Sequence, residues 1–540
     1  MSALMRMLRR GRRRLADERG FTLVVTMGVL MVSSLLLVAA FTATNGDTSV
    51  VRNDLDQKKA YYAAQAAITN YVFHLNQDVN YWEYCYTSAN PRGGTMPSGG
   101  PSAPANRVQV PNSTVGDESY SWVPLAASTA PAPRACDPAR PVPTMLEAGL
   151  AANGTFRIQA TGYSRNVSRT IVATFRRKGF LNYVYYTQFE TLDPATYFPA
   201  NPLPDCGHPY GQRPSSCGSI NFTSGDAING PMHSEDQLSI CGNPTFGRNT
   251  QDAIETVPAP GHYAGPGNCS DNFLAGVRGT FKAPANSVIP PPNNGELLAT
   301  ARADGWTFTG TTQIQLNGAS MTVTKSDGST QTGWPHNGVI YVSSDPQRPC
   351  PAAYSPYNVD YTANPGCGNV SIRGNYTSSL TVASENDVII RGDLTTGVDG
   401  SGQPTSNALL GLVSNNFVRV YHPVSARAAP SAFQCGNAQN TDASPNTIYA
   451  AILAVKHSFI VDNYDCGQSL GTLNVFGAIA QIFRGTVGTS GGTGYLKNYG
   501  YDDRLASEEP PFFLNPVQAA WLIGRETECG QSATSPTACA

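Results

Sequence analysis

Residues able to do chemistry are spread thinly along this 540-residue chain. Residues 488–492, Gly-Thr-Ser-Gly-Gly, match the Gly-x-Ser-x-Gly pattern of a serine nucleophile. That pattern needs a strand before it and a helix after it, whereas this segment lies in a run of Gly and Thr. The seven histidines are dispersed, and none forms the His-Glu-x-x-His pair of a zinc site. We predict no catalytic residue, no metal site and no cofactor.

Carboxylates are the stronger candidates for catalysis. A glycoside hydrolase needs two of them converging at a separation of about 5–9.5 Å. Several acidic residues stand at predicted corners between strands, where Asp is also favoured because it bonds nearby backbone N–H groups. We therefore predict a non-enzymatic protein and keep a polysaccharide hydrolase or lyase as the alternative. The candidate acids are Asp226, Glu235, Asp236, Asp387, Asp393, Asp502 and Asp503.

Tyrosines in polar segments are candidates for binding a surface ligand. An exposed tyrosine can stack on a sugar or anchor a protein contact, although loop tyrosines more often cover a core. The partner would be a polysaccharide or a protein. The net charge of −2 and the lack of a basic patch beyond the first twenty residues predict no nucleic-acid partner. The tyrosines are Tyr183, Tyr185, Tyr186, Tyr354, Tyr357, Tyr361, Tyr495, Tyr499 and Tyr501.

The twelve cysteines form well-separated neighbours and no Cys-x-x-Cys pair. An even number in an exported chain favours disulfides over a zinc site. Sequential pairing is the simplest arrangement, although connectivity cannot be deduced from sequence. In chain order the cysteines are Cys85, Cys136, Cys206, Cys217, Cys241, Cys269, Cys350, Cys367, Cys435, Cys466, Cys529 and Cys539.

An almost charge-free run follows a leader that carries seven arginines. The run extends from Phe21 through Val25, Leu30 and Leu35 to Phe41. At about 1.5 Å per residue, roughly twenty residues cross a ~30 Å hydrocarbon core. The arginines predict a single-pass membrane protein with a cytoplasmic N-terminus and most of the chain outside the cell or in its envelope. A plain membrane anchor would have the same composition.

Helix-compatible sequence continues well beyond the apolar run. Apolar residues recur at helical spacing and form one stripe, which predicts a single helix of about fifty-five residues with an amphipathic second half. The stripe contains Tyr61, Ala64, Ile68, Tyr71, Val72 and Leu75.

The start of this helix resembles type IV prepilins. Residues 20–23, Gly-Phe-Thr-Leu, resemble the site at which prepilin peptidase cuts after Gly and the new N-terminal Phe is methylated. Residues 60–67, Ala-Tyr-Tyr-Ala-Ala-Gln-Ala-Ala, resemble the Ala-rich segment of PilX-type minor pilins, which commonly carry Glu where this chain has Gln65. The resemblance covers about the first 80 residues. It implies processing between Gly20 and Phe21, and prepilin peptidase, other pilins and pilus assembly proteins as partners.

One residue departs from the pattern of major pilins, which carry Glu four residues after the cleavage-site Phe. This chain has Val25 there. In those families the carboxylate meets the N-terminal amine of a neighbouring subunit and offsets the cost of a charge inside the membrane. Val25 therefore indicates a minor or tip subunit and equally permits a protein that never polymerises.

Beyond the helix the chain is predicted to be mostly β. Residues 156–163 and 169–175 alternate in polarity, which predicts an antiparallel hairpin. From about residue 181, short β-rich runs end in Gly-Asn or Gly-Asp corners, as at 370–375 and 388–394. These runs predict a β-solenoid, with a β-sandwich as the alternative. Pro516 suits a first helical position and predicts a short capping helix. The fold class is α+β, mostly β.

The domain organisation follows from these segments. We expect a basic leader at 1–20, a membrane and amphipathic helix at 21–80, and a loop-rich segment with a small β module at 81–180. A β-rich domain at 181–515 and a capping helix with a cysteine-containing tail at 516–540 complete the chain. The predicted role is a minor or tip pilin-like subunit that displays its β-rich domain for adhesion or assembly. A membrane-anchored carbohydrate-active enzyme and a plain cell-envelope scaffold are the alternatives.

Overall fold

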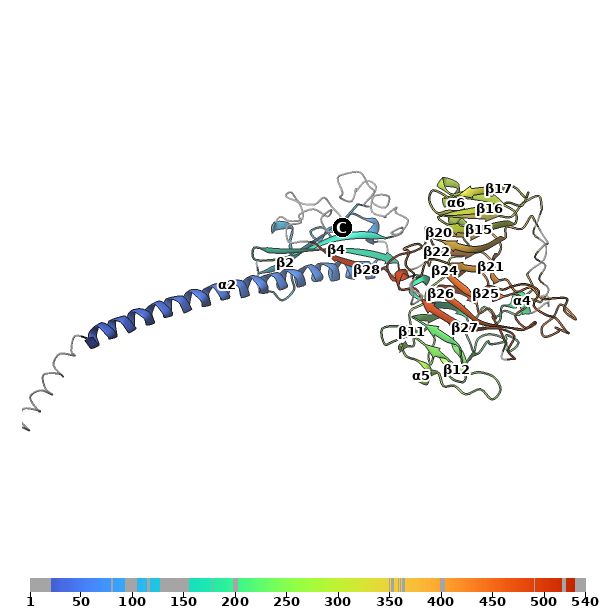
Figure 1. The fold of residues 1–540 in the computed structure, drawn as a ribbon, viewed down its shortest axis with the longest axis horizontal. Coiled ribbons are helices and arrows are strands. Elements are labelled where there is room, and N and C mark those ends of the chain that lie inside the picture. Colours follow the sequence, from blue (N-terminus) through green and yellow to red (C-terminus); the bar gives the residue numbers. More distant parts are fainter. Residues whose placement is uncertain are drawn as a thin grey trace, which may run out of the picture.

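The protein consists of a long helix, a small sheet on the C-terminal half of that helix, and a large β-rich body beyond the sheet (Figure 1). The computed structural model describes residues 21–78, 81–92, 104–113, 117–126, 155–177, 179–197, 203–348, 350, 354–357, 359, 361, 365–398, 404–489, 491–516 and 521–529.

Helix α2 (Phe21–Gln77) is continuous over 57 residues, which confirms the predicted length. No proline interrupts it, so its backbone hydrogen bonds run unbroken. In its second half the predicted stripe is largely buried, with Ala64, Ile68 and Tyr71 no more than 1 % exposed. Within the part of the chain that the structure describes, no helix is long and apolar enough to cross a membrane. The predicted membrane span stays a prediction.

A five-stranded antiparallel sheet covers the second half of α2 in the order β1-β2-β3-β4-β28. The predicted hairpin is confirmed as β3 and β4, joined by a turn at Arg165 and Asn166. The sheet is larger than predicted because β2, from a segment predicted to be loops, pairs with β3, and β28 pairs with β4. The strands are β1 (Val108–Gln109), β2 (Glu118–Pro124), β3 (Phe156–Ser164), β4 (Val167–Arg177) and β28 (Trp521–Glu528). Short 3-10 helices η1 (Tyr81–Glu83) and η2 (Pro104–Asn106) precede them.

The helix and the sheet are in direct backbone contact. A Cβ atom on Gly162 of β3 would lie 2.0 Å from the carbonyl oxygen of Ala60 and 2.3 Å from the backbone nitrogen of Ala64. Only a glycine opposite these small residues allows so close an approach. Beyond this contact, Tyr71 packs edge-on against Trp122, with ring centroids 4.9 Å apart, and close to Phe175, at 5.4 Å. The module therefore has an aromatic core beside a tight backbone contact.

The predicted capping helix near the C-terminus is wrong where the structure describes it. Residues 521–528 form β28, which runs antiparallel to β4. Trp521 packs its indole against Trp82, at 5.1 Å between centroids, and against Phe156, at 4.7 Å. This aromatic burial places the segment in the small module and not over the large body. The large body is consequently inserted between two neighbouring strands, β4 and β28.

The large body is built on a 20-stranded sheet whose longest ladder is parallel throughout. The chain enters the body at β5. Much later in the sequence, β26 pairs with β5 and so joins the later strands of the body to the early ones. In spatial order the ladder is β14 (Trp306–Thr309), β18 (Val339–Ser343), β20 (Leu380–Ser384), β22 (Leu410–Ser414), β24 (Thr447–Ala454), β26 (Ser469–Phe483), β5 (Tyr185–Phe189), β8 (Met232–Ser234), β11 (Ala253–Thr256) and β13 (Thr280–Lys282).

Further parallel ladders lie along other sides of the body. One joins β15 (Thr312–Gly318), β19 (Val370–Tyr376), β21 (Val388–Thr395), β23 (Val418–Val420) and β25 (Phe459–Val461). Another continues from β26 through β27 (Gly494–Tyr501) and β7 (Ala227–Asn229) to β10 (Thr245–Phe246). A separate sheet contains β6 (Phe222–Thr223), β9 (Leu238–Cys241) and β12 (His262–Ala264). An antiparallel arm adds β16 (Ser320–Thr324) and β17 (Thr330–Gly333) to β15.

Helices are short in this body. They are α4 (Pro194–Tyr197), α5 (Phe273–Gly276), α6 (Gly295–Asp304), η3 (Phe180–Asn182) and η4 (Asp503–Ala506). Parallel stacking of short strands differs from the antiparallel sheets of a β-sandwich and disfavours that alternative.

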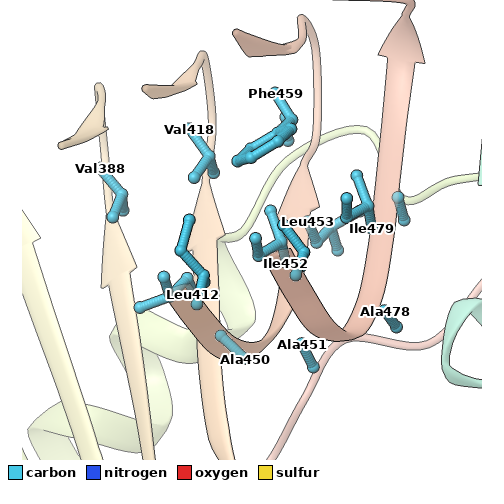
Figure 2. Packing of buried hydrophobic residues seen from close by; sticks show 14 of the residues in the cluster. Val388, Leu412, Val418, Ala450, Ala451, Ile452, Leu453, Phe459, Ala478 and Ile479 are labelled. Atoms are coloured by element: carbon cyan, nitrogen blue, oxygen red, sulfur yellow. The ribbon is translucent and has the colours of Figure 1, made fainter. Parts of the chain in front are cut away.

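The core repeats from rung to rung because the ladders are in register. Val388, Val418 and Phe459 are successive partners on β21, β23 and β25. Figure 2 shows this row beside a second one from β22, β24 and β26, whose partners include Leu412 and Ile452. These side chains are at most 2 % exposed. Each rung thus buries the apolar face of its neighbour.

The contact between β3 and α2 predicts that Gly162→Ala destabilises the protein. The added methyl group would collide with helix backbone, which cannot move aside as a flexible side chain can. We expect a loss of about 1–3 kcal/mol, measured as a lower urea midpoint by tryptophan fluorescence of the full chain. In the control, Gly500→Ala, the new methyl group lies 3.4 Å from Phe476, an ordinary contact. Equal midpoints for the two variants would contradict the close packing.

Candidate functional site

The second half of α2 has two opposite apolar faces, and the described part of the chain covers one of them and leaves the other exposed. The sheet buries the face with Ala60, Ala64 and Tyr71. On the other side Val51, Leu55, Tyr62 and Phe73 are between 51 % and 70 % exposed. Their spacing of four, seven and eleven residues places them in one line along the helix. We call these four residues the outer stripe.

The first half of α2 is apolar on every side. Its large side chains, among them Val25, Leu30 and Leu35, are exposed by 46 % to 71 %. A helix that is hydrophobic all round is normally buried in a protein or in a membrane. Gly20 lies outside the described residues, and so do the side chains of Phe21 and Phe41. The predicted processing site therefore stays a prediction.

A specific hydrogen-bond partner explains why residue 65 is glutamine and not glutamate. Its Nε2 donates a hydrogen bond to a carboxylate oxygen of Glu526 on β28, at 2.8 Å. A glutamate at position 65 would place a second carboxylate against Glu526, and two like charges so close destabilise each other. The amide therefore suits a module whose sheet is closed by β28.

The candidate catalytic acids do not converge on one site. Asp393 accepts hydrogen bonds from the backbone N–H groups of Asn446, at 2.9 Å, and Thr447, at 3.1 Å. Every other candidate contacts its own cationic or histidine side chain. These pairs are Asp226–Lys497, Glu235–His233, Asp236–Arg213, Asp387–Arg419, Asp502–Arg504 and Asp503–Arg248.

Arg419 illustrates the structural role of these ion pairs. It stands on β23 between Asp387, which precedes β21, and Asp462, which follows β25, at 3.1 Å and 3.0 Å. Burial raises the pKa of Asp387, while the guanidinium opposes that rise. The hydroxyls of Tyr354 and Tyr361 donate to Asp462 at 2.5 Å and 2.7 Å. This network links three successive rungs and leaves no carboxylate free for acid–base work.

The predicted ligand-stacking tyrosines face inward. Seven of the nine are at most 6 % exposed, and Tyr354 and Tyr361 are partly buried at Asp462. This burial confirms the interpretation that loop tyrosines cover the core and contradicts the alternative of exposed sugar-binding rings. The seven buried ones are Tyr183, Tyr185, Tyr186, Tyr357, Tyr495, Tyr499 and Tyr501.

Eight cysteines of the described residues form disulfides between sequence neighbours, as predicted. Cys85 and Cys529 are disulfide-bonded as well, and their predicted partners, Cys136 and Cys539, lie outside the described residues. Ser490 of the Gly-x-Ser-x-Gly segment also lies outside them. The four bridges described in full are Cys206–Cys217, Cys241–Cys269, Cys350–Cys367 and Cys435–Cys466.

One group of potential metal ligands occurs among the described residues, formed by Cys435, Asp465 and Cys466. Both sulfur atoms are joined in a disulfide, whereas a metal would need thiolates. Asp465 pairs with Arg427 at 2.8 Å. This group is therefore a structural contact and not a metal site.

His233 is a buried titratable group with two acidic neighbours. Its Nε2 lies 2.9 Å from Glu235 and its Nδ1 lies 3.1 Å from Glu255. Tyr183 donates to the same Glu255 oxygen at 2.8 Å, and the ring of Tyr186 stacks on the imidazole. Burial lowers the pKa of His233, but the hydrogen bonds and charges of the two glutamates outweigh it and raise the pKa.

This geometry predicts that His233 stabilises the body less as the pH rises. A folded-state pKa above the unfolded value gives stabilisation that is complete below pH ~6.5 and is lost as pH rises through the folded pKa. Thermal unfolding of the full chain between about pH 6 and pH 9 should show a falling Tm. The loss should be on the order of 1 kcal/mol.

The matched control is His233→Gln, which removes the charge but can still hydrogen-bond. Its Tm should start lower at pH ~6 and change less across the same range. Parallel pH profiles for the variant and the unmodified protein would contradict an imidazolium at this position.

Comparisons with known proteins give little beyond this geometry. No family model matches the chain, and no curated protein matches it. Among solved structures, the competence-associated pilin ComZ from Thermus thermophilus is similar to this chain. The two are 12 % identical, the match covers 88 % of this chain and 98 % of that one, and the TM-score is 0.29.

Proposed function

We propose that this protein is a non-enzymatic minor or tip subunit of a type IV pilus or a related secretion machine. The observation that carries the proposal is α2, a single helix that is apolar and exposed all round in its first half. In its second half the same helix is buried on one side by its own sheet. A subunit that is held in a membrane and then packed among other helices needs this combination.

Processing would begin at the leader. Prepilin peptidase would cut after Gly20, and the amine of Phe21 would then be methylated. Before assembly, residues 21–41 would lie in the membrane, with the arginine-rich leader in the cytoplasm and the rest of the chain outside. The run 23–39, whose side chains the structure describes, falls short of the roughly twenty residues of a span. The proposed span therefore includes the apolar positions that flank this run in the sequence.

Assembly would use the outer stripe. Val51, Leu55, Tyr62 and Phe73 continue the exposed apolar surface of the first half of α2 along the side away from the sheet. Helices of neighbouring pilin-like subunits are the proposed partners for this surface. Val25 supplies no carboxylate for the N-terminal amine of a neighbour, which suits a subunit with few copies or one at an end of the filament.

The large body supports the same assignment. Figure 1 places it beyond the C-terminal end of α2, away from the apolar first half. A domain of this size at every position would crowd a helical array, whereas a tip has room for it. Stacked parallel ladders with a repeating core favour a β-solenoid that is displayed outside the cell for adhesion or assembly. The separated acid pairs give no support to the enzyme alternative.

The outer stripe predicts that Leu55→Glu prevents incorporation. A charge in a helix–helix interface is costly to desolvate, while the same residue in the free subunit faces water. The amount of this protein in sheared filaments should fall by about tenfold or more, measured by immunoblot against the total cellular amount. Lys58→Gln, on the same exposed side of α2, should leave that ratio within about twofold.

Folding must be checked separately from assembly. Both variants should keep the urea midpoint of the unmodified protein, because neither position packs against the sheet. Normal incorporation of Leu55→Glu would contradict the proposed packing. Absence of the unmodified protein from filaments and from their base would favour a plain envelope scaffold.

A further inference from the structure

A polar groove of about 450 Å³ opens on the β15–β19–β21 ladder, on the outer side of the β-rich body. The floor is set by strand register. Gln315 of β15 pairs with Arg373 of β19, and the preceding residue of β19, Ile372, pairs with Ile390 of β21. Arg373 and Arg391 follow this pair on their two strands, at the point where the register shifts between Ile372 and Gly374. Both arginines line the groove.

Each arginine is held in place by an uncharged neighbour. Arg373 donates from Nε to the side-chain oxygen of Gln315 at 2.7 Å. The guanidinium of Arg391 lies 4.5 Å from the ring centroid of Tyr421 and 5.6 Å from that of Tyr361. Across the described ranges, neither arginine forms an ion pair with a carboxylate, unlike Arg419 on the next rung. Their terminal N–H groups therefore remain available to a ligand.

This arrangement has an energetic consequence. Two arginines and one carboxylate in the lining give the groove a net positive charge. An anionic ligand is attracted by this charge and can accept two parallel hydrogen bonds from each planar guanidinium. The preset side chains also lose little conformational entropy on binding.

The walls supply neutral hydrogen-bonding groups. Thr322 and Thr324 of β16 line one side, and Gln313 and Ser371 lie along the floor. The acidic group in the groove is Asp442, an exposed residue whose carboxylate accepts from the Tyr421 hydroxyl at 3.2 Å and from the N–H of Ala443 at 2.7 Å. One carboxylate does not make the pair that a glycoside hydrolase needs.

We propose that this groove binds a segment of acidic polysaccharide, with two sugar carboxylates on Arg373 and Arg391 and sugar hydroxyls on the amide and hydroxyl side chains. The aromatic ring in the lining, Tyr421, is buried, so bases have no stacking platform there. The chain's net charge of −2 also gives no broad positive field for nucleic acid. The inference rests on the β-rich body alone and does not depend on how α2 is used.

Isothermal titration of the full chain in detergent with a defined oligogalacturonate tests the proposal. The unmodified protein should bind it. The double variant Arg373→Gln with Arg391→Gln should bind about tenfold more weakly or worse, because both charge-assisted contacts are lost. Arg278→Gln with Arg302→Gln makes the same charge change at two exposed positions outside the groove, and its affinity should stay within about twofold.

A third variant and two further ligands separate specific binding from general charge attraction. Asp442→Asn removes the opposing charge and should tighten binding a few-fold. The methyl ester of the same oligosaccharide, which has no carboxylate, should not bind measurably at about 1 mM. A single-stranded oligonucleotide should bind more weakly than the oligogalacturonate.

Four results would overturn the proposal. They are no binding of the oligogalacturonate at about 1 mM, equal affinity of the double variant, equal affinity for the methyl ester, and preference for the oligonucleotide. An unchanged urea midpoint for the double variant confirms that a loss of affinity comes from the groove and not from unfolding.

Discussion

The structure depends on how the apolar surface of α2 is covered. In its second half, one face is closed by the protein's own sheet through backbone contact at Gly162 and a core of aromatic rings. The first half and the outer stripe remain uncovered by any described part of the chain. Exposed apolar area of this extent calls for lipid or another protein. Insertion into a membrane would cover this apolar surface before assembly, and packing against other helices would cover it afterwards.

The same module fixes where the large body is held. The chain leaves the small sheet at β4 and returns to it at β28, the neighbouring strand, so the body has two attachments side by side. A hydrogen bond from the Tyr501 hydroxyl to the carbonyl oxygen of Leu181, at 2.7 Å, joins the exit segment to the last strand of the body. A domain held at two adjacent points is displayed in a defined direction, which suits a body presented beyond the C-terminal end of α2.

Local periodicity allowed much of the fold to be predicted. The stripe through Ala64, Ile68 and Tyr71 has helical spacing, and the β3–β4 hairpin has clean alternation around a turn, so each carries its own signal. Residues 521–523 carried no such signal, because a short apolar run after Pro516 fits a helix or a strand. The rings that pack against Trp521, those of Trp82 and Phe156, are more than 350 residues earlier in the sequence.

The chemistry of the site was harder to predict for the same reason. Whether a carboxylate is free depends on its partner, and Asp226 pairs with Lys497, 271 residues away. Whether a tyrosine binds a ligand depends on its burial, which polar flanking sequence does not reveal. The arginine groove arises from strand pairing, because residues 373 and 391 come to line one groove only when β19 and β21 lie side by side. The short β-rich runs predicted the strands but not their order.

The central claim is that this chain follows the prepilin route, and its mature N-terminus tests this most directly. Mass spectrometry of the protein from envelope and filament fractions, with prepilin peptidase present and absent, would identify the first residue and its modification. The account predicts a chain that begins with N-methylated Phe21 when the peptidase is present and an uncleaved leader when it is absent. An intact Met1 in both samples would contradict it.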